Sequence, residues 1–197
     1  MLFRSAAPDA GDRNIFHVWS PENPAVFIRL NEGMELPLTD LVIARFEELT
    51  PPNPCIPPGM PSSMATPLPI QFVSRDEETI ELRLSAFDIV RVIHLDAAGE
   101  SGDIAATLQG HSTGNWDGNT FVVRTNRISW PYFDDGGIPQ NENVDVVERF
   151  TLNEDGTELD YLMTVTEPAS FTEPVTLQWR WVTLGEQLSP LHCVSGG

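Results

Sequence analysis

The stretch GHSTGNWDGNTFVVRT, residues 110–125, decides the fold, because two strand-like runs flank a tight turn within it. The turn tripeptide DGN (117–119) consists of residue types that tight turns select, and glycine adopts positive φ at no steric cost. The turn therefore explains three of the polar residues without any appeal to function. His111, Ser112 and Trp116 are not explained by it, and His111 and Trp116 become candidates for a site.

The same pattern of alternating apolar and polar residues continues from Ile70 to the end of the chain. Eight runs carry it: IQFVS (70–74), TIELRLS (79–85), FDIVRVIHLD (87–96), HSTGNW (111–116), TFVVRT (120–125), VDVVERFTL (144–152), ELDYLMTVT (158–166) and VTLQWRWVTL (175–184). Such alternation is typical of half-buried strands. We predict an all-β protein with an eight-stranded antiparallel up-and-down barrel, whose closure removes exposed edges. A two-sheet sandwich is the alternative.

The residues before the barrel are predicted to contain short strands, one helix and an extended proline-rich segment. The runs IFHVW (15–19) and AVFIRL (25–30) are expected to be strands or extended arms. The stretch LTDLVIARFEEL (38–49) has Thr39 as a candidate N-cap and apolar residues at roughly helical spacing, which predicts one short helix of about three turns. Eight prolines within residues 51–69 predict an extended strap over the surface or across the end of the core.

Length and composition favour one domain. A chain of 197 residues with 41% hydrophobic residues can bury a full core without a second one. We expect a single barrel domain over 1–197, with N-terminal strands and a helix (1–50), the strap (51–69), the barrel strands (70–184) and a C-terminal tail (185–197).

The charge balance restricts the partners. The chain has 29 acidic and 11 basic residues, a formal net charge of −18. That field repels nucleic acid and anionic membranes, so it indicates a cationic partner or simply a solubilising surface. No apolar run approaches the roughly 20 residues that span a bilayer, so we expect no membrane insertion. The opening MLFRSAAPDAGDRN has too short an apolar part for a signal peptide.

Strand alternation places three aromatic side chains inside the predicted barrel. Trp179 and Trp181 lie on the apolar side of VTLQWRWVTL, and Tyr161 lies on the apolar side of ELDYLMTVT. An eight-stranded barrel is just wide enough to fill itself with side chains or to hold one small ligand. The three residues are therefore candidate ligand contacts, together with Trp116 at the hairpin.

A longer loop, ISWPYFDDGGIPQNEN (128–143), adds three more aromatic residues. Trp130, Tyr132 and Phe133 are predicted to form either a lid over the barrel mouth or an apolar cap. A lid of this kind favours an aromatic or polycyclic ligand.

One acid is predicted on the inner face. Glu148 shares its side of the strand with Val146 and Phe150, and an isolated buried charge is very costly. Arg91 is its natural partner, so a structural ion pair is one interpretation, and an arrangement with the neighbouring Arg149 is another. The functional interpretation makes Glu148 a general acid or base with a raised pKa.

The histidines offer a second proton-transfer group. His111 lies beside the hairpin and either takes part in a site or hydrogen-bonds the strap or the turn. His94 lies on the opposite face of its strand from Arg91, and the sequence does not show which face points inward. His17, His94, His111 and His192 lack the close spacing of metal sites, so no metal is expected. No cofactor fingerprint is present either.

Five motifs resemble those of a family of bacterial, mostly exported proteins of uncharacterised function. They are CIPPGMP (55–61), RVIHLD (91–96), GHSTGNWDGNT (110–120), VVERF (146–150) and EPASFTEP (167–174). Their order and spacing extend the resemblance from about Asp12 to Cys193. The hairpin departs from the family at Asn119 and Phe121, where an acidic residue and a leucine are usual, which weakens any role for an acid at that turn.

The resemblance implies a lipocalin-like barrel, a periplasmic or secreted location, and a disulfide between Cys55 and Cys193. Taken alone, the two cysteines are equally consistent with a bridge and with two thiols in a reducing compartment.

Together these observations predict a small exported barrel that binds an apolar or aromatic small molecule. As an enzyme it would be a cofactor-independent isomerase, cyclase or lyase, with Glu148 and His111 moving a proton, Arg91 stabilising negative charge and His94 in the wall of the site. The alternative is a non-catalytic lipocalin-like carrier in which Arg91 neutralises Glu148. A third possibility is an interaction module that docks through the strap. Ligand identity and oligomeric state stay open.

Overall fold

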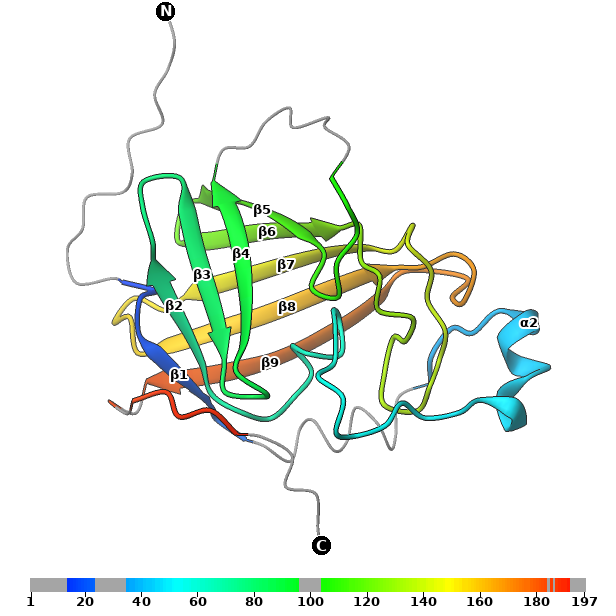
Figure 1. Ribbon diagram of the computed structural model, residues 1–197. Helices are drawn as coiled ribbons and strands as arrows, with labels where there is room; N and C mark the ends of the chain where they lie inside the picture. The colour runs from blue at the N-terminus through cyan, green and yellow to red at the C-terminus, as the bar shows by residue number, and fades with distance from the viewer. Residues whose placement is uncertain (1–13, 24–34, 96–103, 184, 186, 192–197) are drawn as a thin grey trace, which may run out of the picture.

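The computed structural model describes residues 14–23, 35–95, 104–183, 185 and 187–191. Within this part, nine strands form a closed barrel in chain order (Figure 1). They are β1 (Val18–Pro21), β2 (Ile70–Ser74), β3 (Thr79–Leu84), β4 (Ile89–Leu95), β5 (His111–Asp117), β6 (Thr120–Asn126), β7 (Asp145–Leu152), β8 (Glu158–Thr166) and β9 (Val175–Thr183). The predicted all-β closed barrel is confirmed.

The predicted number of strands was wrong, because a ninth strand closes the barrel. In β1, Trp19 pairs with Ile70 of β2 on one side and with Thr183 of β9 on the other. This strand lies partly within the predicted run IFHVW. The other early run, residues 25–30, lies outside the described residues.

The prediction of a uniformly antiparallel barrel was also wrong, because β4 and β5 are parallel. They pair over Ile93–Leu95 and Ser112–Gly114, and we call this short ladder the β4–β5 seam. A parallel pair requires a crossover connection rather than a hairpin. The connection here runs over residues 96–110, well beyond the roughly two to five residues of a hairpin loop. That length was the signal in the sequence.

The predicted three-turn helix is mostly absent. The segment contains α2 (Asp40–Ile43), of one turn, and a 3-10 turn η1 (Phe46–Glu48). Thr39 does not cap α2, because its hydroxyl donates to the Ala169 carbonyl at 3.0 Å. Of α2, Val42 is the buried residue, and Figure 1 shows the segment projecting away from the barrel. Helical spacing of apolar residues does not stabilise a longer helix when most of these residues, such as Leu41, Ile43 and Phe46, stay exposed.

The proline-rich strap covers one end of the barrel. Its section around Met60 and Met64 is fully buried in the core. The Met60 N–H donates to the Leu108 carbonyl at 3.0 Å, and Gln140 Nε2 donates to the Met60 carbonyl at 2.7 Å. Gln109 Nε2 donates to the Pro58 carbonyl at 2.8 Å. These bonds connect the strap to the loops that precede β5 and β7.

The barrel interior is filled largely by aromatic side chains. Phe150 packs against Phe72, Tyr161 and Trp181, with ring centroids 5.1, 4.8 and 6.4 Å away. Burying such rings removes a large apolar area from water, which stabilises the fold. The inward faces predicted for β7, β8 and β9 agree with the burial patterns of these strands.

The quoted hairpin is a β5–β6 pair whose glycines have distinct tasks. Gly118 lies in the turn with φ of 63°, as predicted. Gly114 points into the barrel, where an added Cβ would lie 2.6 Å from Phe121 Cζ and 2.8 Å from Ile93 Cγ2. Gly114 therefore permits the close packing of Phe121 under the β4–β5 seam.

We predict that Gly114→Ala lowers the free energy of unfolding by about 1–3 kcal/mol, because the new methyl group overpacks the core. Urea unfolding of the purified variant measures the change. Gly136→Ala is the control, since its Cβ would approach only the flexible Asp134 carboxylate, at 3.1 Å. Equal stability of the two variants would contradict the packing argument.

Candidate functional site

A buried ion pair crosses the middle of the barrel. Arg91 on β4 and Glu148 on β7 form two parallel hydrogen bonds, from Nη1 to Oε1 at 2.9 Å and from Nη2 to Oε2 at 2.6 Å. Both side chains point inward because strand alternation places them with the apolar residues of their strands. This is the bidentate geometry in which a guanidinium and a carboxylate bind most strongly.

Three further side chains complete the network. The Tyr161 hydroxyl on β8 donates to Glu148 Oε1 at 2.7 Å. Arg91 Nη2 also donates to Thr125 Oγ1 on β6 at 3.1 Å and to Ser112 Oγ on β5 at 3.4 Å, and these two hydroxyls lie 2.8 Å apart. Five consecutive strands, β4 to β8, therefore each contribute one residue. We call these five residues the core network.

The core network is dry. Glu148 is 0% exposed and Arg91 is 1% exposed, so no space the size of a water molecule touches the Glu148 side chain. Burial alone would lower the pKa of Arg91, but the Glu148 charge and its hydrogen bonds raise it. Burial, followed by the negative charge of Glu148, raises the pKa of Tyr161 well above its usual range. The network therefore contains one cation, one anion and a neutral phenol.

This geometry limits the chemistry of Glu148. Its carboxylate accepts three hydrogen bonds and has no exposed surface on which a substrate could bind. The predicted Glu148–Arg91 pair is present, and the alternative pairing with Arg149 is not, since Arg149 lies 3.5 Å from Asp117 on the surface. A proton-transfer role for Glu148 would require the network to open.

The two predicted histidines lie together, but away from the core network. His94 on β4 and His111 on β5 stack with ring centroids 5.1 Å apart and an interplanar angle of 25°. Both belong to the half-buried, outward-facing positions of their strands, on the opposite side of the sheet from Arg91 and Ser112. The structure thus brings these two motif residues side by side on the outside of the β4–β5 seam.

The predicted aromatic lid residues are mostly buried. Trp130 and Phe133 are buried, and Trp130 Nε1 donates to Ser62 Oγ of the strap at 3.2 Å. Tyr132 packs edge-on against Trp130, and Phe133 packs edge-on against Phe171. The loop and the strap therefore form one cover. Trp116 is separate from it and packs against Phe121, with ring centroids 5.0 Å apart.

Three inward residues of β4 and β9 keep a small exposed fraction. Among the inward residues of β4 and β9, Ile89 is 8% exposed, Leu177 is 6% exposed and Trp179 is 7% exposed. The two other residues that were predicted to contact a ligand inside the barrel are almost fully buried. They are Tyr161 and Trp181. We call Ile89, Leu177 and Trp179 the strap mouth.

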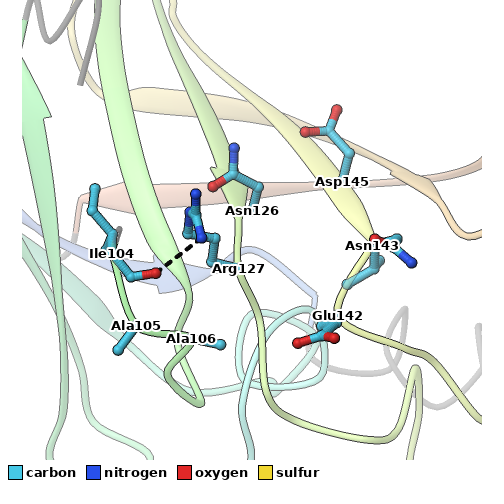
Figure 2. Close-up of a pocket in the computed structure, with 9 residues that line it drawn as sticks. Ile104, Ala105, Ala106, Asn126, Arg127, Glu142, Asn143 and Asp145 are labelled. Carbon is cyan, nitrogen blue, oxygen red and sulfur yellow. Dashed lines mark hydrogen bonds between the residues drawn. The ribbon is translucent and has the colours of Figure 1, made fainter. Parts of the chain in front are cut away.

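A separate hollow lies outside the barrel, beside the end of β6 and the start of β7. It has a volume of about 690 Å³ and is lined by Ile104, Ala105, Ala106, Asn126, Arg127, Glu142, Asn143, Val144 and Asp145. Figure 2 shows Arg127 turned toward the Ile104 carbonyl, to which its Nη1 donates at 3.0 Å. None of the predicted site residues lines this hollow, and its lining is mainly polar and exposed.

Several contributing residues were not identified from the sequence. Ser112 and Thr125 were not singled out as polar partners of Arg91, although their inward positions follow from strand alternation once the register is known. Gln140, whose amide donates to both Met60 and Trp130 carbonyls, had no sequence signal at all. Cys193 lies outside the described residues, so the bridge to Cys55 stays a prediction from the resemblance.

Two further features of the described residues concern metal sites and membrane-spanning helices. In the part of the chain that the structure describes, no group of three or more His, Cys, Asp or Glu side chains is arranged to hold a metal ion. No helix in the same part is long and apolar enough to cross a membrane.

Comparison with known proteins adds no family assignment. No protein-family model, curated protein or solved structure matches the chain. The closed barrel implied by the resemblance is present, whereas membership of the exported family, with its motifs, has no support beyond the residues themselves.

We predict that Glu148→Gln lowers the free energy of unfolding by about 3–5 kcal/mol, because it leaves the Arg91 charge buried without a counter-ion. The apolar triple variant Arg91→Met/Glu148→Leu/Tyr161→Phe is expected to be more stable than Glu148→Gln, since it removes every member of the charged group. Chemical denaturation of both variants tests this. A Glu148→Gln protein as stable as the wild type would rule out a structural ion pair.

The raised pKa of Tyr161 predicts a loss of stability at alkaline pH. The folded state keeps the phenol protonated, whereas the unfolded chain releases the proton near the ordinary value of 10.0. The contribution of Tyr161 is therefore complete below about pH 10 and is lost as the pH rises toward the higher folded pKa. The chain has two tyrosines, Tyr132 and Tyr161, so their ionisation can be followed by tyrosinate absorbance. Tyr161→Phe should flatten the pH dependence of unfolding above pH 10; an unchanged slope would contradict it.

Proposed function

We propose that this protein binds a small molecule with an apolar or aromatic body inside the strap end of the barrel, and that it acts as a carrier. The observation that carries the proposal is an aromatic-rich barrel interior in which the strap mouth residues Ile89, Leu177 and Trp179 are 6–8% exposed, together with a cover that has no regular secondary structure. Small-molecule sites are commonly concave and mainly apolar, with few polar groups, and the mouths of β-barrels are one of their usual places.

The cover is suited to movement. The strap contributes two methionines, Met60 and Met64, to the core, and methionine adapts to cavities of different shapes. Neutral hydrogen bonds, rather than ion pairs or strand pairing, connect the strap to Gln109, Trp130 and Gln140.

The core network favours a non-catalytic carrier over an enzyme that uses acid/base chemistry. The carrier hypothesis requires Glu148 to be neutralised by Arg91, and the bidentate pair does this. Isomerase, cyclase or lyase chemistry would need Glu148 and His111 at one site, whereas they lie on opposite faces of the barrel wall. Export to the periplasm or the medium rests on the family resemblance alone.

The first test is binding of the apolar dye N-phenyl-1-naphthylamine, followed by dye fluorescence. We expect saturable binding that weakens roughly ten-fold in Trp179→Leu, because the variant removes an aromatic wall of the mouth. Phe46→Leu, on the exposed turn η1, is the matched control and should bind as the wild type does. Native mass spectrometry of the protein as purified would identify any retained ligand.

Two results would end the proposal. One is the absence of saturable dye binding together with an empty protein in the mass spectrum. The other is equal weakening by Trp179→Leu and by Phe46→Leu, which would place the dye elsewhere.

A further inference from the structure

The segment that projects from the barrel presents three large apolar side chains to water. Leu41 and Ile43 of α2 and Phe46 of η1 are 58%, 57% and 55% exposed. Single exposed apolar residues are ordinary on protein surfaces, but these three lie within six consecutive residues of one projecting segment (Figure 1). We call the three side chains the apolar knob.

The base of this segment is fixed to the barrel on both sides of the apolar knob. Before the knob, the Thr39 N–H donates to the Ser170 carbonyl at 2.9 Å. After it, Leu49 packs against the hydrophobic core, and within it Val42 is only 4% exposed. The fold therefore holds the backbone in place, while the side chains of the knob add little to the packing of the core.

Exposed acidic side chains surround the apolar knob. Within residues 35–48 the acids are Glu35, Asp40, Glu47 and Glu48, and the single basic residue is Arg45, which gives the segment a net charge of −3. All four acids are exposed. We call them the acidic rim. An apolar surface with a polar rim is the usual anatomy of a site at which proteins associate.

The charge of the surroundings restricts which occupant fits the apolar knob. A second copy of this chain would bring together two acidic rims and two molecules of net charge −18, and an anionic membrane would be repelled by the same field. A partner with Lys or Arg beside an apolar face would instead pair with the rim carboxylates while the apolar surfaces exclude water. An amphipathic helix with basic flanks has this chemistry.

We propose that the apolar knob and its acidic rim form a docking surface for a basic amphipathic segment of a partner protein. The surface includes no residue of the core network or of the strap mouth. The proposal therefore adds an interaction site to the barrel, and it does not depend on ligand binding inside.

Two peptides of identical leucine and lysine composition test the proposal. The first is about four helical turns long, and its leucines recur at helical spacing to form one apolar face. The second has the same residues reordered so that no apolar face forms. Fluorescence anisotropy of each labelled peptide is measured against the full chain in about 0.15 M NaCl, where exposed charges are largely screened beyond about 8 Å. We expect the first peptide to bind about ten-fold or more tightly, because the net charge attracts both peptides but only the first covers the apolar knob.

Paired serine variants locate the contact. Leu41→Ser/Ile43→Ser should abolish the preference for the first peptide. Leu108→Ser/Leu191→Ser is the matched control, since it removes two other exposed leucines, 44% and 57% exposed, and should keep the preference. Circular dichroism confirms that each variant is folded. If Leu41→Ser/Ile43→Ser does not fold, Phe46→Ser takes its place.

A second pair of variants tests the acidic rim. Glu47→Gln/Glu48→Gln should weaken binding of the first peptide about three-fold or more, because it removes two carboxylates beside the apolar knob. Glu154→Gln/Asp155→Asn changes the net charge equally in the exposed turn between β7 and β8 and should have a smaller effect.

Four results would overturn the proposal. Equal binding of the two peptides would show attraction by net charge alone, and a preference that survives Leu41→Ser/Ile43→Ser would place the contact elsewhere. A wild-type dimer in analytical ultracentrifugation that this variant loses would make a second copy the occupant. Sedimentation of the wild type, but not of the variant, with phosphatidylcholine vesicles would make it a lipid surface. Each of these results leaves ligand binding inside the barrel unaffected.

Discussion

The contact on which the rest of the structure depends is the bidentate pair between Arg91 and Glu148. It joins β4 to β7 across the barrel, and Ser112, Thr125 and Tyr161 extend it to the three other strands of that half. The β4–β5 seam is the only parallel pairing among the described strands. Its ladder has only three residue pairs, although β4 and β5 each have seven residues. Arg91 crosses this seam through its bonds to Ser112 and Thr125, and so supplies cross-strand bonds where the backbone supplies few.

A buried ion pair contributes little net stability compared with apolar residues of the same volume, so stability alone does not account for it. We infer that its main effect is on geometry. The planar guanidinium of Arg91 fits the Glu148 carboxylate in one orientation, which sets the position of β4 relative to β7. The hydrogen bonds of Arg91 to the Ser112 and Thr125 hydroxyls then set the positions of β5 and β6 relative to β4. A one-residue shift of β4 would place Arg91 outside and Val90 or Val92 in the network.

The sequence predicted the strands and their inward faces well where the alternation of apolar and polar residues is enough to identify them. It predicted them poorly where contacts between distant residues determine the structure. Alternation identified the inward positions of Glu148, Tyr161 and Trp181, since it is a local property of each strand. It did not orient β4, because both faces of this strand are partly apolar, and only the long-range pair with Glu148 settles that Arg91 points inward. The helix at 38–49 was predicted from local spacing alone, but most of its apolar residues stay exposed: of α2 only Val42 is buried, whereas Leu41 and Ile43 are exposed. The strap contacts through Gln140 follow from the packing of two loops, which no local pattern encodes.

The motif residues divide into two groups according to what they contact. Gly114, Glu148 and Arg91 serve the interior of the barrel, and Gly118 makes the hairpin turn, so most of the residues behind the family resemblance define a fold. His94 and His111 do not take part in the interior, yet they stack at the outer side of the same seam that Arg91 crosses within. The seam is therefore supported on both faces, by a polar network inside and by stacked imidazoles outside. Under the proposed function, residues that distinguish one ligand from another are expected in the strap and its covering loop, where neutral hydrogen bonds and methionine packing allow substitution without loss of the barrel.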